Sequence, residues 1–485
     1  MLKHLSSHDH FISFITDHVS SLSPADIQRL RSDSFDSALY KVQKINFDSI
    51  HGLLQPLYSN TGRPAKDQIE IFRSLLLMNH FGFTSIDKWV KAVASDHLYA
   101  ILAGFDPSHL APLGSYYAFM HRVWGTKKIE KIFPEGHHKK DPPKNKKPAS
   151  GQKWDNVPDG ITAQLLDKYT NLEGTPDPDR PELILQELFN ELALLPSIEK
   201  HILDNPVISA DGSSLHILSN PYGIPIDKTD KNSKRRYSDP DADWGWDSHE
   251  KRWYFGYSLF ALSCHSPSLS VDLPLFFSIN PASQHDSVSL FPALAQFRSL
   301  CPKMKYQYLC GDSAFDNKST FLLCKQWGMT PVIDFNKRNT GNKRIDDNIT
   351  LDEEGHPLCH AGYKMTYDGY CKDRDRHKYR CPLKTKKVGS CNCQDACSDS
   401  PYGRTFYIQG KDNPRYAFKV LYKSKKWKEL YKNRTSSERV NNRILNNYNV
   451  EYMHTHTTAR YSFFTMLACI NIHLDAWYKK ANQEG

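Results

Sequence analysis

The sequence predicts an α/β protein: a mixed sheet with flanking helices, preceded by an all-α region and interrupted by a cysteine-rich insertion. Three observations support this fold class. Apolar residues recur at helical spacing before residue 125, and strand-like and helix-like segments follow one another after about residue 200. Six of the eleven cysteines fall between residues 359 and 397. The 485 residues leave room for several domains. We expect the following segments: 1–125 helical, 126–160 a basic linker, 161–340 the first part of the core, 341–410 the insertion, and 411–485 the second part of the core.

The composition excludes a small stapled scaffold and a mostly disordered chain, since 39% of the residues are hydrophobic and 12% are aromatic. Residues 1–14 lack the apolar stretch of a secretory signal. The most apolar C-terminal stretch, residues 461–478, is interrupted by Asn471, His473 and Asp475, which are costly in a bilayer. We therefore expect a cytoplasmic protein with no membrane partner.

The N-terminal part reads as helices with tight turns. Ile71, Phe72 and Leu75 share one face of a predicted helix, residues 84–87 offer a capping box for the next one, and a third covers about 115–123. Such a module is either a DNA-binding helix-turn-helix relative or a small helical domain, and the spacing alone does not choose between them.

The linker that follows is strongly basic. Residues 127–153 hold nine Lys against three acids, and Pro142, Pro143 and Pro148 oppose regular structure. This segment is either a solvated spacer or an arm that lies on phosphates.

The core is predicted from its strands and helices in order. We expect strands at 207–210, 253–262, 273–279, 306–310 and 331–335, and helices at 287–300, 317–327 and about 435–447. Apolar residues at helical spacing between 463 and 477 predict a further helix packed on the sheet. The neighbouring Trp244 and Trp246 are either buried against the core or available to stack on bases.

Three acids stand out in this core. The strand at 207–210 ends at Asp211-Gly212, and the strand at 306–310 ends at Gly311-Asp312. Ligands of open α/β sheets tend to bind at strand ends, so the two acids meet if their strands are neighbours. Glu438, near the start of a predicted helix, is the best candidate for a third acid.

Each acid also has a purely structural interpretation. Asp211 could belong to a turn, and Asp312 could cap the next segment. Glu438 could close a capping box with Thr435 or pair with Arg434 at i,i+4. If the acids converge, three carboxylates without a histidine-rich cage favour Mg²⁺ over Zn²⁺, and a pair of Mg²⁺ ions serves phosphodiester cleavage.

The combination of motifs resembles the DDE transposases of bacterial insertion sequences, with the Tyr-Arg-Glu-Lys type of signature. The resemblance rests on Ile208-Ser209-Ala210-Asp211-Gly212, on Gly311-Asp312-Ser313-Ala314-Phe315-Asp316 and on Tyr431-x-x-Arg434-x-x-x-Glu438-Arg439. It extends to Phe255-Gly256-Tyr257, to His285-Asp286 and to the N-terminal helical module, with Gly62-Arg63-Pro64 and Pro112-Leu113-Gly114-Ser115.

This resemblance implies an RNase H-like fold in which Asp211, Asp312 and Glu438 bind two Mg²⁺ or Mn²⁺ ions. The enzyme would cut at the transposon ends and transfer the freed 3′-OH into target DNA. Its partners would be double-stranded DNA, at terminal inverted repeats and target, and a second copy in a synaptic homodimer; its place would be the nucleoid. Alternatives are a transposase-derived sequence-specific DNA-binding protein and a metal-dependent nuclease without strand transfer.

The predicted DNA-binding residues surround Glu438. The resemblance gives Tyr431 and Arg434 the role of holding phosphates. The Lys of the family signature falls on Leu445 here, so Arg439 and Arg443 supply the basic face instead. Residues 415–443 carry ten Lys and Arg against two Glu, which concentrates the net charge of +9 beside the third acid.

Crowded cysteines in a cytoplasmic chain indicate a zinc site more than disulfides. The possible ligands are Cys359, Cys381, Cys391, Cys393 and Cys397, in a structural or DNA-contacting role. The alternative is a loop whose thiols bind nothing.

Overall fold

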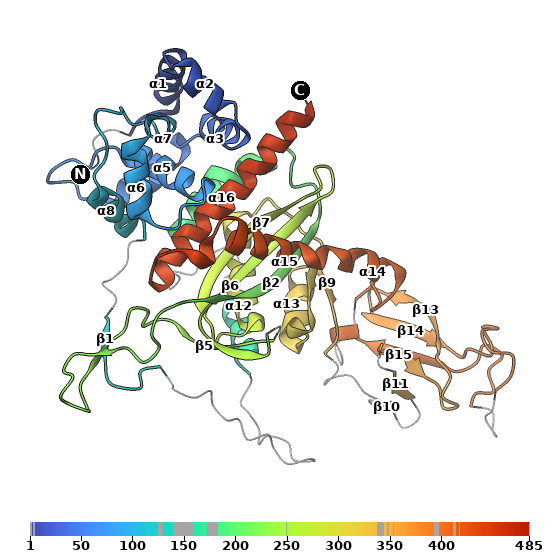
Figure 1. Ribbon diagram of the computed structural model, residues 1–485. Helices are drawn as coiled ribbons and strands as arrows, with labels where there is room; N and C mark the ends of the chain where they lie inside the picture. Colours follow the sequence, from blue (N-terminus) through green and yellow to red (C-terminus); the bar gives the residue numbers. More distant parts are fainter. Residues whose placement is uncertain are drawn as a thin grey trace.

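The computed structural model describes residues 2, 5–124, 130–138, 160–171, 183–248, 250–336, 344–346, 349–352, 354–391, 397–410, 414–416 and 418–484. Figure 1 shows a helical region, a central sheet and a smaller sheet region that projects from one end of the molecule. No helix in these ranges is both long and apolar enough to cross a membrane.

A mixed sheet forms the centre of the molecule. Its strands are β2 (Val207–His216), β5 (Asp243–Asp247), β6 (Arg252–Ser266), β7 (Val271–Pro281), β8 (Tyr308–Gly311) and β9 (Thr330–Ile333). The order is β5-β6-β2-β8-β9, and β7 also pairs with β6, beyond the segment that β5 covers. β6 is antiparallel to β2 and β7, whereas β2, β8 and β9 are mutually parallel. β7 therefore runs in the same direction as β2 and β8.

Helices cover both faces of this sheet. The crossover helices α12 (Asp286–Leu300) and α13 (Lys318–Gln326) lie on one face, with α9 (Ile161–Asn171) against both. α12 connects β7 to β8 and α13 connects β8 to β9, so both crossovers lead toward the β9 edge of the sheet. Right-handed crossovers that lead in the same direction place their helices on the same face. The other face is covered by α15 (Thr435–Asn442) and α16 (Thr457–Glu484) (Figure 1). The mixed α/β architecture predicted from the sequence is confirmed.

The N-terminal helical region is more extensive than its sequence pattern predicted. The helices are α1 (His8–Ser20), α2 (Pro24–Leu30), α3 (Asp33–Lys44), α4 (His51–Leu54), α5 (Gln68–His80), α6 (Ile86–Ser95), α7 (His97–Ala103) and α8 (Leu113–Trp124). The first four and α7 were not predicted; α2, α4 and α7 have seven residues or fewer, whereas α1 and α3 are as long as the predicted helices. The cap of α6 is Ser85, whose side chain accepts from the Lys88 N–H, rather than the expected Thr84.

One hydrophobic core joins this region to the sheet. α16 packs against β7 on the sheet and against α5, α3 and α8 of the helical region, with α10 (Leu183–Phe189) and α11 (Leu195–Glu199) nearby. All but two residues of α5 are buried, so this helix is a core element and not an exposed recognition helix. The predicted core helix near residues 463–477 is confirmed as the central part of α16, and His473 there is fully buried and bonded to Ser197 and Pro274.

A buried ion pair links the N-terminal helical region to α16. The ammonium of Lys41, on α3, lies 2.6 Å from a carboxylate oxygen of Asp475 on α16, and the Lys41 side chain is only 1% exposed. Arg443 and Tyr448 also donate to Asp475. Burial lowers the pKa of Lys41, and Asp475 opposes that effect. Burial alone would raise the pKa of Asp475, but Lys41 and the other donors hold it below its usual value.

Three smaller sheets lie outside the central sheet in the described residues. Between β9 and α14 (Lys425–Tyr431) lie two three-stranded antiparallel sheets, built from β10 (Arg344–Asp346), β11 (Ile349–Leu351), β12 (Pro357–Leu358), β13 (Thr366–Cys371), β14 (Arg376–Arg380) and β15 (Thr405–Gln409). Their own buried core is small: Ile349, Leu351, Met365, Tyr379 and Ile408. The third sheet joins β1 (Ile132–Phe133), β4 (Arg235–Arg236) and β3 (Ile224–Pro225).

The β1 strand lies within the basic segment that we expected to lack regular structure. It forms because Ile132 and Phe133 have strand partners in Arg236 and Arg235. Most of the remaining lysines of that segment lie outside the described residues.

Candidate active site

Two parallel strands bring the first two acids together. Val207, Ile208 and Ser209 of β2 pair with Tyr308, Leu309 and Cys310 of β8. The same register, continued by two residues, places Asp211 of β2 beside Asp312, which directly follows β8. The predicted meeting of two acids from neighbouring strands is therefore supported by the sheet register.

Asp211 does not end its strand, contrary to the sequence-based expectation. β2 continues to His216 because β6 pairs with it antiparallel from Ser209 to His216, well past the end of its parallel partner β8. Asp211 thus points from a strand interior and not from a turn. Asp312 does cap the next segment, since its Oδ1 accepts the N–H of Ala314 at 2.8 Å.

Glu438 lies on α15, which crosses β2, β6 and β7. Three hydrogen bonds fix the helical segment on the sheet: Ser209 donates to the Asn433 carbonyl, the Ser263 and Ser436 hydroxyls are 3.1 Å apart, and Asn441 donates to the Asp211 carbonyl. The side chain of Glu438 accepts from Arg434 at 2.5 Å, so the i,i+4 pair forms and the capping box with Thr435 does not.

The acids form one electrostatic cluster. Burial, followed by the charges of Asp286, Asp312 and Glu438, raises the pKa of Asp211 to about 8, against a weaker opposing effect of Arg434. Such a rise means that the negative charges stand close together in a poorly solvated place without enough positive charge to balance them. Perturbed groups of this kind are concentrated at functional sites.

Asp286 is a fourth acid of this cluster, and it was not among the predicted site residues. It is the first residue of α12, and burial raises its pKa to about 6, with Asp312 adding to the rise and His285 opposing it. A Cβ on Gly212 would lie 2.0 Å from Asp286 Oδ1, so the absent side chain of Gly212 makes room for this carboxylate. The available signal was its position: Asp286 follows β7, which runs parallel to β2 and β8 and so ends at the same edge of the sheet.

The donor set suits hard divalent cations. Asp211, Asp312, Glu438 and Asp286 offer only carboxylate oxygens, the ligands that Mg²⁺ and Mn²⁺ prefer. The raised pKa values of Asp211 and Asp286 fit a site that a cation would balance.

Ligand-type side chains also gather elsewhere. In the described ranges, two groups of three have their ligand atoms within 4.8 Å of one another: His216, Asp247 and Glu250, and Asp352, Glu354 and His356. The second group is already ion-paired, because Lys364 contacts both Asp352 and Glu354. Neither group contains a predicted catalytic acid, and the side chain of Glu438 is instead held by Arg434.

The predicted DNA-binding residues lie along the same helical segment, and most have protein partners. Tyr431 stacks on Trp427 with ring centroids 4.3 Å apart. Arg439 binds Asp272 with two nitrogens, and Arg443 pairs with Asp475 at 2.7 Å. Arg434 is paired with Glu438.

The cysteines of the insertion divide into two sets. Cys359, Cys381, Cys391 and Cys397 line one small cavity, whereas Cys371 is exposed at the end of β13. Cys393 lies outside the described residues.

Trp244 and Trp246 differ in burial, so each fits a different one of the two alternatives that the sequence left open. Trp246 is 52% exposed and lies against the exposed Trp253, with ring centroids 5.5 Å apart, while Trp244 is half-buried against Phe255. The β5–β6 hairpin leaves Trp246 on the surface because the strand alternates its side chains between two faces.

Acids from two parallel strands, with a third on a helix that covers the sheet, are an arrangement that suits metal-assisted chemistry on phosphodiesters. Comparison with known families identifies the protein further: the chain belongs to the transposase DDE domain family, whose model matches residues 203–474. A second family model, the transposase domain DUF772, matches residues 29–121 in the helical region. No curated protein and no solved structure gave a match. The protein is therefore a transposase-type enzyme that acts on DNA.

Proposed function

We propose that this protein cuts DNA at the ends of an insertion sequence and joins the freed 3′-OH ends to target DNA, with Asp211, Asp312 and Glu438 as the catalytic acids. The observation that carries the proposal is the convergence of acids from β2, β8 and α15, together with the rise in the pKa of Asp211 to about 8. The strand order and crossovers support an RNase H-like core.

Two Mg²⁺ or Mn²⁺ ions held by the acids would activate the attacking water or 3′-OH and stabilise the leaving oxygen. The chain's own residues orient this site. The hydrogen bonds of Ser209, Ser263 and Asn441 fix α15 on the sheet, so that Glu438 stays at the edge where Asp211 and Asp312 meet. Asp286 adds a fourth negative charge, which strengthens the demand for cations.

DNA phosphates would lie along the helical segment that carries Glu438. We assign Arg434, Arg439 and Arg443 to phosphate contacts and Tyr431 to a stacking or hydroxyl contact. The Glu438 carboxylate now accepts a hydrogen bond from Arg434. If Glu438 held a cation instead, the Arg434 guanidinium would be free to contact a DNA phosphate. Two copies would bind paired terminal inverted repeats as a homodimer, on nucleoid DNA.

We further propose that Cys359, Cys381, Cys391 and Cys397 hold a structural Zn²⁺ ion. Their common cavity supports this, as does the small apolar core beside it, since so few buried residues rarely stabilise a fold without a staple.

The test is a matched set of isosteric variants assayed on DNA that carries the element's own ends. Asp211→Asn, Asp312→Asn and Glu438→Gln should each abolish metal-dependent cleavage and leave end binding largely intact. Glu429→Gln, an exposed acid on the preceding helix, is the control and should cleave normally. Normal cleavage by any of the three variants shows that the residue is misassigned.

Two rivals give different products in the same assay. A metal-dependent nuclease without strand transfer would yield cut DNA but no joined product. A DNA-binding protein derived from a transposase would bind the ends and leave them uncut in Mg²⁺ and in Mn²⁺.

A further inference from the structure

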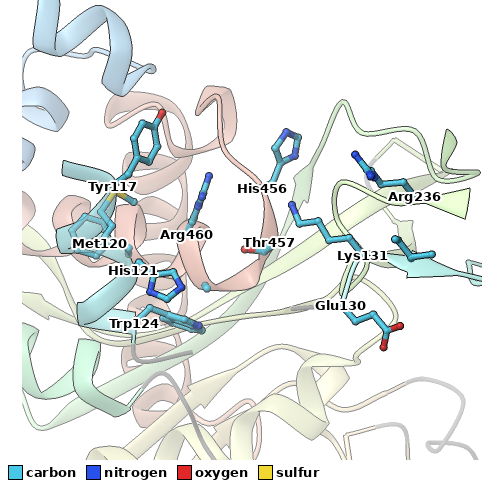
Figure 2. Close-up of a pocket in the computed structure, with 13 residues that line it drawn as sticks. Tyr117, Met120, His121, Trp124, Glu130, Lys131, Arg236, His456, Thr457 and Arg460 are labelled. Atoms are coloured by element: carbon cyan, nitrogen blue, oxygen red, sulfur yellow. The ribbon is translucent and has the colours of Figure 1, made fainter. Parts of the chain in front are cut away.

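A cavity of about 740 Å³ lies between the helical region and the N-terminus of α16. Its walls come from α8, from the start of α16 and from the small sheet of β1 and β4 (Figure 2). None of the four clustered acids lines it. Its volume falls in the range of ordinary ligand pockets.

The floor of this cavity is aromatic and apolar. Tyr117, Met120 and Trp124 occupy one face of α8, at the i, i+3 and i+7 spacing, and Phe463 faces them from α16. Flat aromatic surfaces of this kind stack on nucleobases whatever the sequence, since every base has a π-face.

Cations surround that floor. Lys131, Arg236 and Arg460 line the cavity, and all three are exposed. Figure 2 shows Lys131 extending toward the start of α16, whereas the Glu130 carboxylate points away from the centre of the cavity. Within the described ranges none of these three cations has a carboxylate partner, although Arg434, Arg439 and Arg443 near the acids each have one.

A buried donor at this site also lacks a partner. Trp124 is 7% exposed, and its indole N–H has no hydrogen-bond acceptor among the described residues. An unmade bond of a buried donor costs about 1–3 kcal/mol in proteins, so a shift of the Trp124 ring that gave its N–H a ligand acceptor would be favoured.

The N-terminus of α16 attracts an anion less strongly than a helix N-terminus with free N–H groups would. The N–H groups of Thr457 and Thr458 already donate to the carboxylates of Asp239 and Asp241. His456 pairs with Asp239 at 2.7 Å. Attraction for an anion in this cavity therefore comes from the side chains of Lys131, Arg236 and Arg460, of which Arg460 also lies over the Tyr117 ring, 5.7 Å from its centroid.

We propose that this cavity binds an unpaired nucleotide at the end of the DNA substrate. Its base lies against Trp124 and Tyr117, and its phosphates lie against Lys131, Arg236 and Arg460. The proposal rests on the DNA-cutting function above, since such an enzyme handles strand ends, and it gives the junction between the helical region and α16 a role in holding them.

The experiment is a binding titration of the full chain in EDTA, so that cleavage plays no part. The probes are a fluorescein-labelled duplex with a blunt end and the same duplex with a single-stranded thymidine overhang, followed by anisotropy. The wild type should bind the overhang duplex more tightly. Trp124→Leu should weaken overhang binding by about 5- to 100-fold, the effect of losing one stacked base.

A second variant keeps the test independent of folding. Arg460→Gln changes an exposed residue and should lower the slope of log Kd against log salt for the overhang by about 0.7, the value for one phosphate contact on a single strand. The matched controls are Trp246→Leu, an exposed tryptophan on the β5–β6 hairpin, and Lys305→Gln, an exposed lysine before β8. Neither control should change the preference for the overhang.

The outcomes separate this inference from the proposed function. Equal binding of blunt and overhang duplexes, or loss of the preference in Trp246→Leu instead of Trp124→Leu, overturns the inference and leaves the cutting function standing. Absence of binding to both duplexes overturns both. Metal-dependent cleavage of the element's ends, in the separate assay described above, by a wild type that shows no overhang preference in EDTA contradicts the inference alone.

Discussion

Replacing Asp211 with Asn should make the metal-free protein more stable at neutral and alkaline pH. Asp211 is buried among Asp286, Asp312 and Glu438, and its pKa is raised from 3.8 to about 8. In the unfolded chain the same carboxyl ionises near 3.8, so the folded state binds a proton that the unfolded state has lost between these two values. The contribution of Asp211 to the unfolding free energy is therefore fully present below about pH 4 and is lost as the pH rises to about 8.

The size of the effect follows from the two pKa values. A rise from 3.8 to about 8 corresponds to about 6 kcal/mol at 1.36 kcal/mol for each tenfold change in proton affinity. Asn has the shape of the protonated acid and cannot ionise. The unfolding free energies of wild type and Asp211→Asn should therefore agree near pH 4 and diverge by several kcal/mol near pH 8.

Urea denaturation in EDTA across this pH range measures the difference. Adding Mg²⁺ or Mn²⁺ at pH 8 should stabilise the wild type, because a ligand that binds only the folded state adds RT ln(1 + [L]/Kd), and should leave Asp211→Asn almost unchanged. Asp230→Asn, an exposed acid of a surface turn, serves as the control. The reasoning is refuted if Asp211→Asn is no more stable than the wild type at pH 8 in EDTA.

Three further predictions concern Gly212 beside the acids, the buried Lys41–Asp475 ion pair and the cysteines of the insertion. Gly212→Ala places a Cβ against Asp286 Oδ1 and should reduce metal-dependent cleavage at least about tenfold, whereas Gly52→Ala, with open space at its Cβ, should not; cleavage rates with a circular dichroism check decide this. Asp475→Asn leaves the buried ammonium of Lys41 without its anion and should lower the unfolding free energy by about 3–5 kcal/mol in urea denaturation at pH 7, and an unchanged value would show that the pair is not structural. Cys381→Ser should lower the zinc content measured by plasma mass spectrometry on reduced protein, while Cys371→Ser should not, and a wild type with well under one zinc per chain contradicts the zinc site.

The local patterns that predict strands and helices held because they depend on neighbouring residues alone. β7, α12 and α13 lie within a few residues of their predicted places, and the apolar spacing near residue 470 marks a helix that is indeed buried. The order of the motifs in the sequence also indicates the transposase DDE domain family.

The expectations that failed depended on partners far along the chain. β2 continues past Asp211 because β6 pairs with it. β1 forms within the basic segment because β4 pairs with β1. Trp246 and Trp244 were also not told apart by sequence, because the face of β5 that each occupies follows from its pairing with β6.

The sequence by itself determined the residue types of the candidate site: two acids at the carboxyl ends of strand patterns and a third on a helix within a segment rich in cations. Tertiary structure alone decided which charges meet. The parallel register of β2 and β8 sets Asp211 beside Asp312, the bare Cα of Gly212 admits Asp286, and pairing with Asp272 and Asp475 occupies two of the expected DNA-binding arginines. The physical reason is that Coulomb interactions and burial depend on distance in space and on solvent access, and the strand register and helix packing fix both.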